Sequence, residues 1–480
     1  MKQNHYYRSL RCCAAGLLCL AALLTGGCKK YLDLPLPLST IAGSSAYTTD
    51  KSSAAVLNGI YARLMGAPQL FDGSGIGFST SLYADELQSI GDPTSADRVY
   101  YQNAVQSDNT GALWTLLYKQ LYTTNLVIEG VTPTTTATLR YRSQWLGEAY
   151  FIRALLHFYL VNLYGDAVIV TSSDYAVNNS LPRSTPQDVY VQIIKDLQQA
   201  QSLLTDEYKD GNGLTTTERG RPNKAAATAL LARVYLYTKD WANAETQASL
   251  VIAQPVFSLP RPADVFLHTS LETVYALAPL ANSWVRDYNV YNNGMPAIVP
   301  AFPASNISVA MSSSLVNAFE PGDERLVTWA RKATDTAAAP VSYYFPDKYK
   351  SRTNGDEYIV MLRLAEQYLI RAEARVRLNK LTAAKQDLDA VRARAGLGGV
   401  TAAGADALLD AIMKERRTEL FTEEGHRLFD LRRTGRLNAV MTPLTPQKGG
   451  AGWQPFMQWW PIPTNDIFAN PHLTQTEGYQ

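Results

Sequence analysis

The residues that most often carry out chemistry in proteins are few in this chain, and they are scattered. No two of the five histidines share a helical face at metal-binding spacing, and the HExxH motif is absent. The histidines are His5, His157, His268, His426 and His472. The four cysteines all fall at or before residue 28, at Cys12, Cys13, Cys19 and Cys28. The chain beyond Cys28 therefore has no thiol for catalysis, for zinc–thiolate binding or for a disulfide, and we expect no metal and no cofactor.

Two further patterns are too common to indicate catalysis. The run GSGIGF at 73–78 is not a dinucleotide fingerprint, because no strand–helix unit flanks it. The acidic pairs Asp85/Glu86 and Glu423/Glu424 have the residue types of a glycosidase. Adjacent acidic residues are frequent in surface loops, however, so we do not predict a hydrolase.

The densest charged segment is KERRTELFTEEGHRLFDLRRTG, at 414–435. Its charges alternate in sign at spacings that allow pairing along and between helices. These charges belong to Glu415, Arg416, Glu419, Arg427, Asp430 and Arg433. We interpret the segment as an ion-pair network that holds a C-terminal helix to the rest of the fold.

The aromatic content offers a different kind of chemistry. The chain has 28 Tyr, 8 Trp and 13 Phe, and an aromatic ring on a surface presents an apolar face to a sugar or a peptide. The 44 basic and 43 acidic side chains are nearly balanced, so nothing favours a nucleic-acid partner. Binding through aromatic rings is the chemistry that the composition favours.

The elements that must position these groups are mainly helical. We predict a helix from about Asp50, with Asp50 as its cap, and a helix over 140–165 that stops at Gly165. Further predicted helices cover 113–131, 186–204, 223–238, 241–253, 357–378, 381–394 and 405–424. Residues 66–110 are predicted to form a loop, and 255–350 a long irregular insertion with short strands.

An internal repeat indicates how the helices pack. Two segments about 140 residues apart, around AAATALLARVYLYTKDWANAE and around AEQYLIRAEARVRLNKLTAAK, carry matching small residues. The matched pairs are Ala232/Ala372, Trp241/Leu381, Ala244/Ala384, Ala248/Leu388 and Val251/Val391. Small residues at this spacing allow two antiparallel helices to approach closely, so we predict stacked, tetratricopeptide-like helical hairpins.

The first residues predict a targeting segment. Lys2, Arg8 and Arg11 precede an apolar run of signal-peptide length, and the run ends in Leu24-Thr25-Gly26-Gly27-Cys28. Small residues directly before a cysteine resemble the bacterial lipobox, in which the cysteine is lipidated and becomes the first residue of the mature chain. We therefore predict a signal peptide over 1–27 and a lipid anchor on Cys28.

Several segments together resemble the SusD/RagB family. They are CKKYLDLPLP after the lipobox, GEAYFIRALLHFYLVNLYGDAVIV (147–170), GRPNKAAATALLARVYLYTKDW (220–241), SLVNAFEPGDERL (314–326), RLAEQYLIRAEARVRLNKLTAA (363–384), ERRTELFTEEGHRLFDLRRTG (415–435) and PIPTNDIFANPHLTQTEGY (461–479). They follow the order of the family across nearly the whole mature chain. The ending LTQTEGY differs, because it lacks the usual Asn after Gln475.

The resemblance implies a mainly α fold, in which four tetratricopeptide-like hairpins carry long irregular loops and minor β structure over residues 28–480. It implies an outer-membrane lipoprotein on the cell surface of a Bacteroidota bacterium, not an enzyme. Such a protein captures oligosaccharide as the lid of a SusC-like TonB-dependent transporter. The alternatives are a RagB-like protein that captures peptides, and a helical-repeat lipoprotein that only docks other proteins.

The resemblance also directs attention to particular residues. It makes Trp114 and Asn125 scaffold positions and places the ligand face in loops outside the hairpins, at about 70–108 and 255–350. Asp85 matches a recurrent acidic position near that face. The other candidates are chosen because their side chains could stack on or hydrogen-bond a sugar: Asp72, Tyr83, Tyr100, Tyr101, Trp284, Arg286, Tyr288, Tyr291, Tyr343 and Tyr344.

Overall fold

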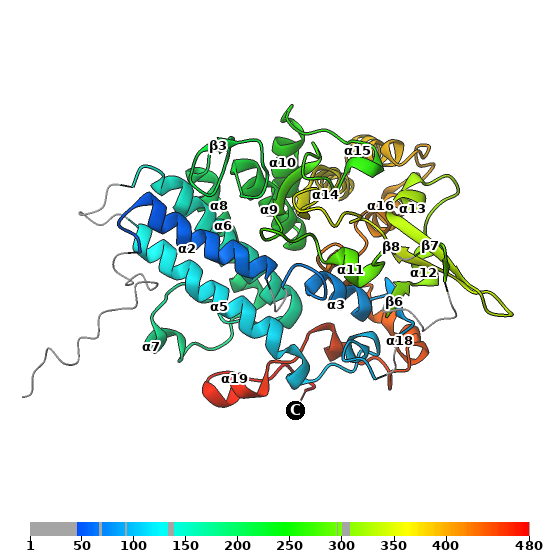
Figure 1. Cartoon of the computed structure of the whole chain (residues 1–480), viewed down its shortest axis with the longest axis horizontal. Coiled ribbons are helices and arrows are strands. Elements are labelled where there is room, and N and C mark those ends of the chain that lie inside the picture. Colours follow the sequence, from blue (N-terminus) through cyan, green and yellow to red (C-terminus); the bar gives the residue numbers. More distant parts are fainter. Residues whose placement is uncertain are drawn as a thin grey trace, which may run out of the picture. The chain divides into compact units, whose positions relative to one another are not determined.

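Helices form most of the protein, and the long ones pack against one another in succession along the chain. The computed structural model describes residues 46–66, 70–91, 94–132, 139–294, 296–299 and 308–479, so the predicted signal peptide and Cys28 lie outside the described residues. The long helices are α2 (Asp50–Met65), α5 (Ser107–Val131), α6 (Arg142–Tyr164), α8 (Pro186–Leu203), α9 (Lys224–Tyr237), α10 (Trp241–Ile252), α14 (Leu364–Arg377), α15 (Leu381–Arg394) and α16 (Ala405–Glu419). Neighbouring pairs run from α5 and α6 through α8, α9, α10 and α14 to α15 (Figure 1). The predicted fold class is confirmed.

The repeated small residues lie where the hairpin helices meet. Ala232 in α9 and Ala372 in α14 are fully buried, and so are Ala244 in α10 and Ala384 in α15. A methyl group at each position brings the helix axes close together, and larger side chains above and below fill the remaining space. The internal repeat therefore corresponds to two tight hairpins, α9–α10 and α14–α15, and α10 packs against α14.

Local signals explain several helix ends. Gly165, which follows α6, has φ +74°, a left-handed conformation that favours glycine, and it ends the helix where predicted. The predicted cap of α2 was wrong: Thr49 caps the helix by accepting the N–H of Ser52 at 3.2 Å. Asp50 instead accepts the backbone N–H groups of Arg140 and Tyr141, so its carboxylate fixes the start of α6 against α2.

Short elements connect the scaffold to the loops. The shorter helices are α3 (Ile76–Tyr83), α4 (Arg98–Tyr101), α7 (Tyr175–Asn178), α11 (Asp287–Tyr291), α12 (Ser313–Val316), α13 (Glu324–Trp329), α17 (His426–Arg433), α18 (Leu437–Gln447), α19 (Thr464–Ala469) and the 3₁₀ turns η2 (Pro262–Asp264) and η3 (Pro455–Gln458). The prediction of loop over 66–110 was wrong for α3, in which every residue is buried. The predicted helix over 405–424 ends earlier, at Glu419, and α17 follows as a separate helix.

The described strands are short and form small sheets. They are β1 (Leu87–Ser89), β2 (Tyr208–Lys209), β3 (Thr215–Thr216), β4 (Thr273–Leu277), β5 (Ile298–Val299), β6 (Val309–Met311), β7 (Ala330–Asp335), β8 (Ser342–Pro346) and β9 (Ile359–Arg363). The antiparallel pairs are β1–β6, β2–β3, β4–β9 and β7–β8, while β5 pairs with β7 in parallel. The predicted helix over 357–378 was wrong at its start, because Ile359–Arg363 pairs with β4 as a fully buried strand.

A buried ion-pair network joins the C-terminal helices to the scaffold, as the charged segment predicts. Arg363, at the end of β9, contacts the carboxylates of Glu272 and Glu423 at 2.7 and 2.8 Å, and it also contacts Glu419. Burial alone would raise the pKa of Glu419, but the charges of Arg394, Arg363 and Arg325 outweigh it and lower the pKa. Removing one partner would leave a buried charge uncompensated, so this network holds α16 in one position.

Candidate functional site

Two predicted ligand residues, Trp284 just before α11 and Tyr288 on α11, form a partly exposed aromatic surface. Trp284 and Tyr288 are both half-buried, and the guanidinium carbon of Arg352 lies 5.8 Å from the Trp284 ring centroid and 5.0 Å from that of Tyr288. We call Trp284, Tyr288 and Arg352 the aromatic platform. A cation beside two half-exposed rings offers stacking surface and hydrogen-bond donors in the same place.

The backbone around the platform is held by specific side chains. The amide of Asn354 donates to the carbonyl oxygen of Leu280 at 2.9 Å, and Arg352 donates to the side-chain oxygen of Asn293. Gly294 has φ +67°, and a Cβ there would lie 2.4 Å from the Tyr288 hydroxyl oxygen. A side chain at position 294 would be strained in this backbone conformation and would displace the Tyr288 hydroxyl, so glycine lets the turn after α11 lie close to that ring.

Two buried carboxyl groups join the start of α11 to the turn at residues 72–73. Asp72 accepts the N–H of Arg286 at 2.6 Å, and Asp287 accepts the N–H of Gly73 at 2.8 Å. Burial raises the pKa of Asp72 to about 6, although the hydrogen bond from the Arg286 backbone works against this, and burial also raises the pKa of Asp287 well above its usual range. Asp72 therefore joins the 72–73 turn to the platform. The Arg286 side chain stays partly exposed, with Nε 3.9 Å from Asp72.

Three other predicted residues are buried in the fold. Asp85 is 5% exposed, and its carboxylate contacts Arg427 at 2.7 Å and Arg417 at 2.8 Å. Burial alone would raise the pKa of Asp85, but Arg427 and then Arg417 outweigh it and lower the pKa. The hydroxyl of Tyr83 donates to the carbonyl oxygen of Met457 at 2.7 Å, and Tyr291 packs against Phe78. We leave these three side chains out of the proposed platform.

The remaining predicted tyrosines lie in two other places. Tyr100 is half-buried against Trp460, and Tyr101 lies beside the Lys448 ammonium group, on the wall of a cavity of about 410 Å³. Tyr343 and Tyr344 are half-buried residues of β8. The scaffold positions are as expected: Trp114 is 2% exposed, and the Asn125 amide donates to the carbonyl oxygen of Val170.

The sequence prediction missed Arg352 and Asn354, which follow the predicted loop by only a few residues. The polar run KSRTNGDEY at 350–358, directly before the apolar run of β9, was the available signal. The acidic pairs Asp85/Glu86 and Glu423/Glu424 are buried in the fold. Glu423 contacts Arg363 and Lys348, while Glu86 and Glu424 are buried with raised pKa values because of that burial.

Two further observations concern the described part of the chain. In it, no group of three or more His, Cys, Asp or Glu side chains has an arrangement that could hold a metal ion. None of its helices combines the length and apolar character needed to cross a membrane.

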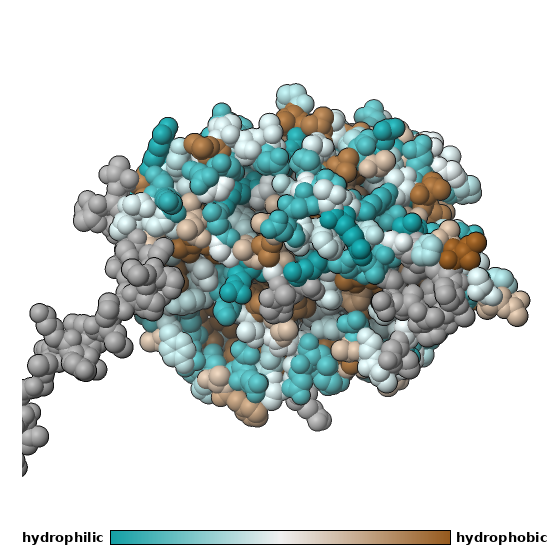
Figure 2. Space-filling view, in the orientation of Figure 1, coloured by the Kyte–Doolittle hydropathy of each residue, from teal (hydrophilic) through white to brown (hydrophobic). Residues whose placement is uncertain are grey.

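Figure 2 shows mainly hydrophilic residues across the middle of the face on which α11 lies. The platform lies on a scaffold of stacked helical hairpins, which is the architecture of the helical-repeat class.

Comparison with known proteins agrees with this class. The model of the SusD family matches residues 328–479, and a model described as "starch-binding associating with outer membrane" matches residues 56–236. SusD-like protein P2 of Formosa agariphila is 27% identical, in an alignment that covers 93% of this chain and 95% of the relative. The chain belongs to the SusD/RagB family, as its sequence motifs predict.

Solved structures show the same fold. Surface glycan-binding protein A of Bacteroides thetaiotaomicron superposes with a TM-score of 0.72 at 21% identity, covering 90% of this chain and all of that one. A laminarin-binding SusD-like protein superposes with a TM-score of 0.70 at 22% identity, covering 90% of this chain and 99% of that one. At these identities the likeness concerns the fold alone.

Proposed function

We propose that this protein captures oligosaccharide on the aromatic platform, at the outer surface of a bacterial outer membrane, and delivers it to a SusC-like TonB-dependent transporter as its lid. The observation that carries the proposal is the partly exposed pair Trp284 and Tyr288, each with its ring close to the Arg352 guanidinium, on a chain of the SusD/RagB family. Two relatives by fold are described as glycan-binding and laminarin-binding proteins. Cys28 is the proposed anchor.

The chemistry of the platform suits capture followed by release. The C–H faces of a sugar pack on aromatic rings, while the guanidinium of Arg352 and the amides nearby supply hydrogen bonds to hydroxyl groups. A shallow surface buries little of the ligand, so we expect dissociation constants in the micromolar range or weaker. The protein performs no reaction in this account, because delivery requires the ligand to leave unchanged.

A panel of glycans and peptides tests the proposal with the protein purified from residue 29 onward. A neutral glycan that binds should lose about 1–3 kcal/mol of binding free energy in Trp284→Ala, in line with the loss of a stacked aromatic anchor. Tyr175→Ala is the matched control, because Tyr175 is 76% exposed on the distant helix α7. Binding of peptides but no glycan would favour the RagB-like alternative, and binding of neither would favour a protein-docking role.

The transporter step needs a separate measurement. Co-purification from detergent-solubilised outer membranes should recover a TonB-dependent transporter with the wild-type protein, and equally with Trp284→Ala, because the platform faces the ligand in this account. If no transporter is recovered under mild solubilisation, the lid role is wrong, whatever the glycan panel shows.

A further inference from the structure

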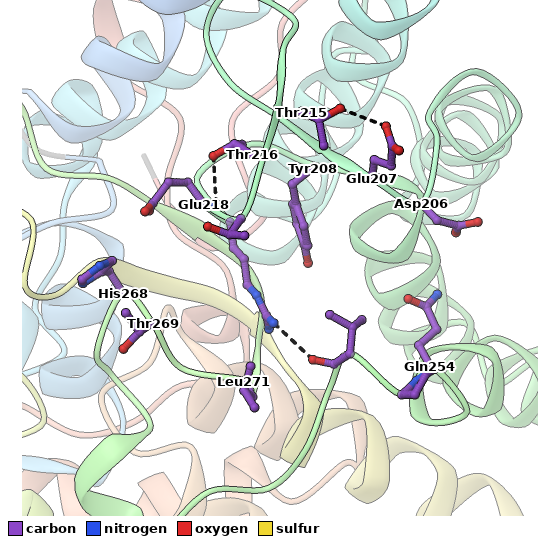
Figure 3. Close-up of a pocket in the computed structure, with 14 residues that line it drawn as sticks. Asp206, Glu207, Tyr208, Thr215, Thr216, Glu218, Gln254, His268, Thr269 and Leu271 are labelled. Carbon is purple, nitrogen blue, oxygen red and sulfur yellow. Dashed lines mark hydrogen bonds between the residues drawn. The ribbon is translucent and has the colours of Figure 1, made fainter.

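A cavity away from the platform lies beside the β2–β3 hairpin. It measures about 740 Å³ and lies between that hairpin and the segment 254–271. We call it the hairpin cavity. Figure 3 shows Tyr208 pointing into the space between His268 on one side and Gln254 on the other. A space of this size accommodates a ligand of one or a few sugar rings.

The base of the hairpin cavity contains a buried cation without an anionic partner. Arg219 is 6% exposed, and no carboxylate of the described residues forms a salt bridge with it. Its guanidinium donates to the carbonyl oxygens of Thr273 and Val256, the latter at 3.2 Å, and lies 5.7 Å from the Tyr208 ring and 5.1 Å from the Phe257 ring. Burial lowers the pKa of Arg219.

Comparable buried arginines in this chain have carboxylate partners. Arg233 pairs with Glu366 at 2.6 Å, and Arg416 pairs with Asp430 at 2.7 Å. Burying a charge is costly unless it is paired. Among the arginines of the described residues that are less than a tenth exposed, Arg219 lacks a carboxylate partner, whereas Arg432, which is more exposed, also donates only to carbonyl and amide oxygens. Arg219 lies on the wall of the hairpin cavity, so a ligand there can supply a negative charge.

The walls offer the other groups that a sugar ring requires. Val256 and Leu271 are 47% and 51% exposed, and with Tyr208 they present apolar surface. The Thr216 hydroxyl and the Gln254 amide supply hydrogen-bonding groups along the same walls.

Carboxylates also line the cavity, but they lie at its rim. Glu207 is bound by Lys209 at 2.5 Å, and Glu218 accepts the Tyr358 hydroxyl at 2.9 Å. Asp206 is exposed. If the carboxylate of a sugar lies at the base, next to Arg219, the hydroxyl groups of that sugar point toward these acceptors at the rim.

We propose that the hairpin cavity is a second glycan site that binds a hexuronic acid residue, with the sugar carboxylate against Arg219 and the C–H face of the ring against Val256 and Leu271. This inference rests on the proposed function, since it presumes that the chain binds glycans, and it assigns acidic oligosaccharides as a ligand class. The segment 350–358 borders both sites: it carries Arg352 of the platform and Tyr358, which holds Glu218 at the rim of the cavity.

The test uses trigalacturonate and its fully methyl-esterified form, titrated calorimetrically at low ionic strength. The ester keeps the rings and removes the charges, so we expect it to bind at least about tenfold more weakly. Val256→Glu and Val256→Lys form a matched pair at an exposed position on the wall. The glutamate should weaken binding of the acid by about tenfold, and the lysine should tighten it, because each places a charge near the sugar carboxylate.

Arg219→Gln should reduce binding of the acid to the level of the ester, and a melting curve records whether that variant folds. The Val256 pair tests the proposal independently of that outcome. Equal affinity for acid and ester would overturn it, as would unchanged binding in both Val256 variants. Loss of trigalacturonate binding in Trp284→Ala would also overturn it, because the acid would then occupy the platform. If the neutral glycans fail to bind while trigalacturonate binds with this charge dependence, the platform proposal fails and the hairpin cavity stands.

Discussion

Replacing Asp85 separates a structural role from a ligand-binding role at the position that the family resemblance placed near the ligand face. Its carboxylate is 6% exposed and contacts Arg427 and Arg417, whose side chains are each 13% exposed. In Asp85→Ala, two largely buried guanidinium groups lose their anionic partner. Breaking a buried pair in this way costs about 3–5 kcal/mol, so we expect the free energy of unfolding to fall by that amount.

Guanidinium chloride denaturation, followed by tryptophan fluorescence and circular dichroism, measures this change. Asp85→Ala/Arg427→Met removes charge from both sides and should recover part of the loss relative to Asp85→Ala. Glycan binding, measured under conditions where the variant is folded, should be nearly unchanged. An unchanged denaturation midpoint together with weakened glycan binding would show that Asp85 contacts the ligand and does not stabilise the fold.

Three further predictions concern the scaffold, pH and the anchor. Ala372→Leu and Ala232→Leu should each overpack a helix contact and lower the free energy of unfolding by about 1–3 kcal/mol, measured by denaturation; two unchanged midpoints would argue against the close hairpin contact. Burial raises the pKa of Glu86 from 4.5 to about 7, so the folded chain retains a proton that the unfolded chain has lost, and stability falls as pH rises through that window. Glu86→Gln should therefore stabilise the protein at pH 8 by roughly 2–3 kcal/mol and have little effect at pH 4; an equal effect at both pH values would contradict this. Cys28→Ala should abolish labelling with palmitate and release the protein from the membrane fraction, and a labelled, membrane-bound variant would disprove the anchor.

Local sequence signals predicted the helical scaffold well because they do not depend on distant contacts. The spacing of Ala232, Ala244, Ala372 and Ala384 reports directly which helix faces touch, and these faces are buried in the structure. Gly165 ends α6 through its own backbone conformation. Such features are properties of a few neighbouring residues, so a single sequence contains them.

The errors occurred where distant partners determine the local structure. Ile359–Arg363 is an apolar run that could extend the following helix, and only its pairing with β4 makes it a strand. Asp50 has the side chain of a helix cap, but it accepts N–H groups from residues 90 and 91 positions later in the chain. Helix α3 lies within a Gly- and Ser-rich stretch whose composition predicts a loop, yet burial of the whole helix outweighs this composition.

The sequence predicted which loops contain the candidate site, but not which of their residues form it. The sequence contains rings and acids in the loops, but it does not indicate which of them are exposed. Tyr291 and Tyr288 lie on the same short helix, and only Tyr291 is buried. Arg219 shows the same difficulty, since its lack of a carboxylate partner can be seen only when all the surrounding residues are placed.

A crystal structure of the protein with the tightest-binding neutral oligosaccharide of the panel would show whether glycan binds on the aromatic platform. We expect a sugar ring stacked on Trp284 or Tyr288, with a hydroxyl group within hydrogen-bond distance of Arg352, and Asp85 still paired with Arg427. A neutral ligand bound instead in the cavity beside Tyr101, or on the α9–α10 hairpin, with the platform empty, would contradict it.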